Sequence, residues 1–130
     1  MKMFSEEWTH ALAEKLKVDE TFQQKAGNFD SNLHFHVLKD PKAGLSEDVS
    51  FGMWVPTVDT YWYGPKNMDE VDIFLEGKAS VYQAVFEGRK NVVIALTTGA
   101  IKLKKGQVTK LTGNLGAVSR FIEVAVSILR

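Results

Sequence analysis

The sequence contains no cysteine among its 130 residues. Disulfide bonds, thiolate metal ligands and a cysteine nucleophile are therefore excluded. It also has no run of about 18 apolar residues, the length that a membrane-spanning helix needs. The N-terminal stretch MKMFSEEWTH lacks the apolar segment of a signal peptide. We therefore expect a cytoplasmic protein, and the chain length favours one domain over residues 1–130.

The sequence also has no excess of charge of either sign. Sixteen basic residues balance sixteen acidic ones, and no basic stripe stands out. Proteins that bind nucleic acids concentrate positive charge, because phosphate contacts supply most of their non-specific affinity. The sequence also lacks a GxGxxG motif and any serine within a nucleophile-elbow glycine pattern. We expect no nucleic-acid partner, no cofactor, no catalytic residue and hence no enzyme.

Apolar residues recur along the sequence with two different spacings. Ser5 can cap a helix on which large apolar residues recur at helical spacing, and Asp19 can cap a shorter helix that ends near Ala26. From residue 31 the period becomes two, which predicts strands. Those predicted strands are 31–37, 49–55 and 58–63, joined by short turns that imply antiparallel pairing.

Residues 71–106 form the most informative stretch. A fourth strand at 71–75 precedes two short predicted helices at 79–86 and 92–98, closed by Gly88 and Gly99. A fifth strand follows at 100–104. Almost every periodic position in this stretch is large and apolar, and no residue there is equipped for bond chemistry. This combination favours a protein that holds an apolar molecule without transforming it.

The C-terminal segment, 115–129, is apolar around most of its helical circumference. Its polar residues form one narrow stripe that includes Ser119, Arg120 and Glu123. A helix with such a wide apolar arc must be covered on two sides. The second cover can be a ligand, a partner chain or another helix.

The segments VDIFLEG, AVFEG, IALTTG and AIKLKKG, in this order, resemble the sterol carrier protein type 2 family. The order of the remaining elements agrees over nearly the whole chain. The resemblance implies an α+β fold, in which a five-stranded, mostly antiparallel sheet is covered by about five helices that enclose a hydrophobic tunnel. Members bind fatty acyl chains, sterols or other lipids, and some are accessory modules beside lipid or quinone enzymes. Because the chain ends Ile-Leu-Arg and lacks a peroxisomal tripeptide, it resembles free-standing prokaryotic members.

The tunnel predicted by this resemblance would be lined by large apolar residues from the central and C-terminal segments. We expect its ligand-binding residues to be Trp54, Phe74, Val81, Val85, Phe86, Ile94, Leu96, Phe121, Val124, Ala125 and Ile128. For any single one of these residues, an ordinary position in a packed core is the more common explanation, and only the set as a whole favours a cavity.

Three polar groups suggest other chemistry. His34 and His36 share one strand face and could begin a metal site, but no third ligand is evident, so we predict solvent-facing histidines and no metal. The acidic cluster around Asp72 is interpreted as a solvated turn with one hydrogen-bonded aspartate. Lysines at 102, 104, 105 and 110 are typical of a protected sheet edge.

The sequence therefore predicts non-enzymatic binding of a long-chain apolar ligand such as a fatty acid, an acyl-CoA or another lipid. Transfer of that ligand, transient membrane contact and a homodimer are compatible with this hypothesis. The alternative is an interaction module that dimerises, or docks on a lipid- or quinone-metabolising enzyme, through its C-terminal helix.

Overall fold

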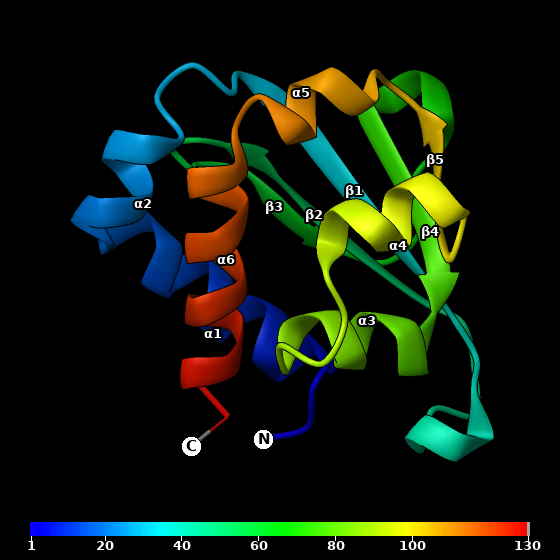
Figure 1. Ribbon diagram of the computed structural model, residues 1–130. Coiled ribbons are helices and arrows are strands. Elements are labelled where there is room, and N and C mark those ends of the chain that lie inside the picture. Colours follow the sequence, from blue (N-terminus) through cyan, green and yellow to red (C-terminus); the bar gives the residue numbers. More distant parts are fainter. Residues whose placement is uncertain (130) are drawn as a thin grey trace.

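A computed structural model of the protein describes residues 1–129. Its centre is a five-stranded sheet with the strand order β3-β2-β1-β4-β5, and Figure 1 shows the helices gathered on one side of it. Only β1 and β4 run parallel, whereas the other three pairs are antiparallel. The strands are β1 (Ser31–Leu38), β2 (Val49–Val55), β3 (Tyr61–Tyr63), β4 (Ile73–Lys78) and β5 (Ile101–Lys105). The predicted α+β fold with a mostly antiparallel sheet is confirmed.

The described chain contains six α-helices. They are α1 (Glu6–Val18), α2 (Glu20–Lys25), α3 (Ala79–Phe86), α4 (Val92–Thr98), α5 (Val108–Thr112) and α6 (Leu115–Ser127). Side chains at three helix starts satisfy free backbone N–H groups, as their residue types predict. Ser5 accepts a hydrogen bond from the Trp8 N–H, Asp19 from Phe22, and Asn91 from Val93. None of the helices among residues 1–129 has both the length and the hydrophobicity that crossing a bilayer requires.

Two strands differ from their predicted ranges by more than one residue at an end. β3 begins only at Tyr61, because the chain turns sharply after β2: the Val58 N–H donates to the Trp54 carbonyl, and Val58 has a φ of 56°. β4 begins at Ile73 and continues through Gly77 to Lys78. It extends further because Gly77 still pairs with both β1 and β5.

The inner face of the sheet carries the core. Phe35 and Phe51 stack with ring centroids 4.9 Å apart, and the fully buried Trp8 of α1 meets Phe51 edge-on. The stacked aromatic rings of β1 and β2 therefore meet α1 through Phe51, and this contact places α1 against the inner face.

On the outer face of the sheet, the environment of His34 differs from the predicted one. The predicted solvent-facing position is wrong, since His34 is only 1% exposed. Gly52 on the neighbouring strand has no side chain, so the Trp62 indole lies across it and donates from Nε1 to His34 Nδ1 at 2.9 Å. The Phe74 ring packs against His34 at a centroid distance of 4.8 Å. Burial lowers the pKa of His34 to about 4, so the ring is neutral at pH 7.

Candidate functional site

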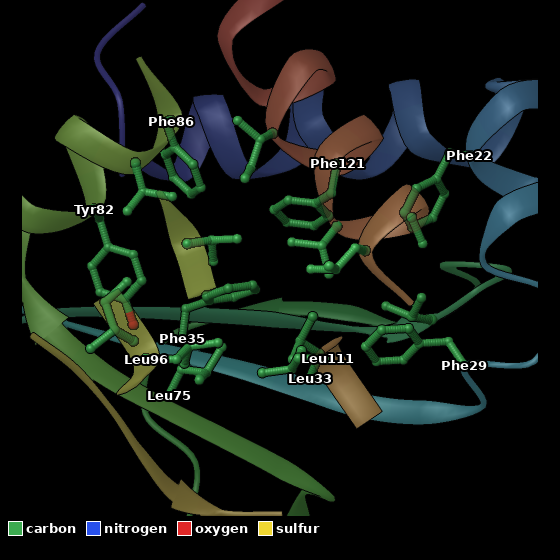
Figure 2. Close-up of a pocket in the computed structure, with 18 residues that line it drawn as sticks. Phe22, Phe29, Leu33, Phe35, Leu75, Tyr82, Phe86, Leu96, Leu111 and Phe121 are labelled. Atoms are coloured by element: carbon green, nitrogen blue, oxygen red, sulfur yellow. The ribbon is translucent and has the colours of Figure 1, made fainter. Parts of the chain in front are cut away.

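An apolar cavity lies between the inner face of the sheet and the helices (Figure 2). Its volume is about 70 Å³. Helices α2 to α6 and every strand except β3 contribute side chains to its walls. The lining residues are Phe22, Phe29, Leu33, Phe35, Val55, Leu75, Tyr82, Val85, Phe86, Val92, Leu96, Ile101, Leu111, Leu115, Ala117, Val118, Phe121 and Ile122.

Strand alternation and helix periodicity both direct side chains into this space. Leu33 and Phe35 are two residues apart on β1, so they share its inner face. Phe121 projects from α6 and stacks on Phe35, with ring centroids 5.5 Å apart and an interplanar angle of 26°. In Figure 2 Phe121 and Phe22 reach from the helices toward the sheet residues. The cavity is therefore the gap left where two apolar layers face each other.

The cavity is small compared with its apolar surroundings. Pockets for small molecules usually measure about 300–1,000 Å³, whereas this one, at about 70 Å³, has the volume of roughly two waters. Side chains therefore fill most of the space in which the sequence predicts a tunnel. A long-chain molecule can enter only if some of the walls move.

The wall formed by α4 and α5 is held least firmly. Ala95 is the one buried residue of α4 and Leu111 the one buried residue of α5. The buried apolar area that fixes a helix scales with such residues, so these two short helices are the easiest to displace. Leu115, at the start of α6, both lines the cavity and is 40% exposed, so the cavity comes close to the surface where α6 begins.

The opposite wall, α6, is anchored at two points. The Trp8 indole N–H donates to the Ala125 carbonyl at 3.1 Å. Arg120 forms a fork on Asp19, with Nε–Oδ1 and Nη2–Oδ2 distances of 3.0 and 2.6 Å, and this pairing holds the pKa of Asp19 below its usual value. Helix α6 also contacts α1, α2, α3 and α5, which cover much of its wide apolar arc within the chain.

The fold places the residues predicted to bind a ligand in different parts of the structure. Four of them line the cavity, namely Val85, Phe86, Leu96 and Phe121. Four more belong to the packed core or its edge without lining the cavity, namely Val81, Val124, Ala125 and Ile128. Their role in binding stays a prediction.

The remaining three point elsewhere. Ile94 is 55% exposed on α4. Trp54 and Phe74 lie on the outer face of the sheet, because each alternates with inward residues of its strand, such as Met53 and Leu75. The structure therefore does not bring these three residues to the cavity.

Several lining residues were not among the predicted ones. Leu33, Phe35 and Leu75 come from the centre of the sheet, where the alternating pattern identified an inner face but not a cavity above it. Phe22 and Phe29 come from the N-terminal third of the chain. Both are large and apolar, but they were not predicted as lining residues because they lie far in sequence from the central segment.

Several of the polar groups considered for other chemistry have structural partners. His36 Nδ1 lies 3.0 Å from Glu76 Oε1, and Asp72 Oδ2 accepts the Asn32 N–H at 2.7 Å. Lys105 Nζ donates to two backbone carbonyls that precede β4. Among residues 1–129 no three histidine or acidic side chains are grouped so that they could hold a metal ion.

Comparison with solved structures gives close agreement in fold, whereas neither the family models nor the curated sequences yield a match. A crystal structure of sterol carrier protein 2 superposes with a TM-score of 0.81 at 28% identity, covering 95% of this chain and 97% of that one. A conserved hypothetical protein from Thermus thermophilus, described as possibly a sterol carrier protein, has a TM-score of 0.77 at 29% identity, with coverage of 96% and 88%.

A more distant relative shows the same fold in complex with a lipid. It is sterol carrier protein 2 from Aedes aegypti with the C16 fatty acid palmitate, with a TM-score of 0.58 at 16% identity and coverage of 95% of this chain and 98% of that one. The agreement extends over nearly the whole chain and leads to one conclusion: the chain is similar to sterol carrier protein 2 and has the same fold.

Proposed function

We propose that this protein binds a long-chain apolar molecule, such as a fatty acid, an acyl-CoA or another lipid, in the cavity beneath α4 and α5, and that it transfers the molecule without catalysing a reaction. The observation that carries this proposal is the cavity itself, whose lining is apolar apart from one tyrosine. The palmitate complex of the Aedes aegypti protein supports it by analogy of fold.

The driving force is the removal of apolar surface from water. Each methylene group that enters the cavity contributes about 0.8 kcal/mol. A chain of a dozen or more methylenes therefore gains enough to offset the separation of α4 and α5, whose buried residues are Ala95 and Leu111. In this proposal the described conformation is the closed state, and α6 is a fixed wall.

Two variants on the same helix test the proposal. Leu96 is half-buried and lines the cavity, whereas Ile94, two residues earlier on α4, is exposed and does not. Leu96→Asp places a carboxylate in the apolar space and should abolish binding of the fluorescent fatty acid cis-parinaric acid. The matched Ile94→Asp protein should bind as the wild type does.

Native mass spectrometry of the freshly purified wild type, followed by solvent extraction, gives the chemical class of any retained molecule. A folded Leu96→Asp protein with normal uptake would place the ligand elsewhere. A wild type that retains nothing and takes up neither cis-parinaric acid nor palmitoyl-CoA would refute the proposed function.

A docking role through the C-terminal helix stays a prediction. Other helices of the same chain cover much of the wide apolar arc that suggested this role. No contact among residues 1–129 favours a homodimer or an enzyme partner over the lipid-binding role.

A further inference from the structure

Tyr82 contributes apolar ring atoms to the cavity wall, whereas protein atoms cover its hydroxyl in the described conformation, so a ligand can reach the hydroxyl only after the walls have moved. Among the eighteen described residues that line the cavity, only Tyr82 carries a polar side-chain atom (Figure 2). The residue is 2% exposed, and its hydroxyl has no hydrogen-bond partner in the part of the chain that the structure describes. Buried polar groups without partners are rare in folded proteins, and each one calls for an explanation.

Packing does not explain the hydroxyl. The Tyr82 ring contacts the rings of Phe4, Phe35 and Phe86, each at a centroid distance of 6.2 Å. A phenylalanine would make the same ring contacts and would leave no polar atom unsatisfied. One Cε atom of the ring lies 3.4 Å from the point where a Cβ on Gly77 would sit, so the hydroxyl end of the ring approaches β4.

The surroundings decide which group the hydroxyl can bind. Burial raises the pKa of Tyr82 well above its usual value, and the nearby charge of Glu76 raises it further, so the hydroxyl keeps its proton and is available as a donor. No lysine, arginine or histidine belongs to the described lining of the cavity. A carboxylate here would lose its hydration with no cation to replace it, whereas a neutral oxygen loses much less.

We propose that the Tyr82 hydroxyl donates a hydrogen bond to an uncharged carbonyl oxygen of the bound molecule, and so favours long-chain ketones, esters or thioesters over free carboxylates and plain hydrocarbons. This inference rests on the proposed function. It places the carbonyl between α3 and β4, with the chain extending along the apolar remainder of the cavity toward Phe121 and Phe22.

The test compares three molecules of equal chain length, namely 2-tridecanone, tridecane and tridecanoate, by their displacement of the neutral fluorophore diphenylhexatriene at pH 8. The wild type should bind the ketone most tightly. Tyr82→Phe should weaken ketone binding about tenfold, which corresponds to about 1.4 kcal/mol, and leave tridecane binding unchanged. Because it removes an unsatisfied polar atom, it should also fold at least as stably as the wild type.

Tyr61→Phe is the matched control, because the Tyr61 hydroxyl bonds to His10 outside the cavity. It should leave all three affinities unchanged. A carbon-13-labelled ketone gives a second readout: its carbonyl stretch should lie at a lower infrared frequency in the wild type than in Tyr82→Phe.

The outcomes separate the two proposals. If the wild type binds the probes and Tyr82→Phe binds the ketone equally well with an unshifted carbonyl band, this inference is wrong and the proposed function stands. If the wild type prefers tridecanoate, the assignment of an uncharged carbonyl is likewise overturned. If the wild type binds neither diphenylhexatriene nor any of the three molecules, the proposed function fails and this inference fails with it.

Discussion

Filling the cavity should make the protein more stable and less able to bind. Ala117 on α6 lines the cavity and is 2% exposed, so Ala117→Leu adds three carbon atoms directly into the empty space. Leucine is also a good helix former, and the substitution leaves the helix intact.

The magnitude follows from the size of the void. Cavities cost about 24 cal/mol for each Å³, so a cavity of about 70 Å³ lowers the free energy of unfolding by about 1.7 kcal/mol. Ala117→Leu should recover part of this amount and raise the free energy of unfolding by as much as ~1.7 kcal/mol. The affinity for cis-parinaric acid should fall at least about tenfold, because the space that receives the chain is occupied.

Urea unfolding followed by tryptophan fluorescence measures the first quantity, and titration with cis-parinaric acid measures the second. Ala84→Leu is the control, because Ala84 lies on α3 but does not line the cavity. An Ala117→Leu protein that is destabilised by more than about 1 kcal/mol would show that the void cannot accept the side chain. One that is stable and binds normally would show that the ligand site is elsewhere.

Two further predictions concern the outer face of the sheet. His34 has a folded pKa of about 4, below its value in the unfolded chain, so the unfolded chain takes up the proton first and stability falls as the pH drops from 6.5 toward 4. The free energy of unfolding should fall by roughly 3 kcal/mol, which urea unfolding at pH 7, 5 and 4 would measure. A His34→Gln protein with the same pH dependence would contradict this prediction. Gly52→Ala should cost about 1–3 kcal/mol or more, because its Cβ would overlap the Trp62 ring and the Leu33 carbonyl oxygen. Thermal unfolding tests this against Gly27→Ala, whose Cβ would find its nearest neighbour at 3.7 Å, and equal melting temperatures for the two variants would refute it.

The sequence predicted those features that depend on near neighbours in the chain. The caps at Ser5, Asp19 and Asn91 and the alternation along β1 and β2 were all predictable, because each follows from residues within one helical turn or one strand. Glycine spacing also located the two short helices between β4 and β5. Such local signals determined the elements and their order, whereas the α+β fold was implied by the resemblance to the sterol carrier protein type 2 family.

Tertiary structure alone decided which apolar residues face the cavity. Alternation along each strand places Trp54 and Phe74 on the face opposite Phe35, but only the packing of the helices on one side of the sheet decides which face borders the cavity. The burial of His34 likewise depends on Gly52, which belongs to another strand and leaves room for the Trp62 indole. The burial of a side chain and the volume of a cavity both depend on contacts between distant segments. No local pattern therefore specifies that the tunnel is nearly closed, or that the Tyr82 hydroxyl beside it is buried without a partner among the described residues.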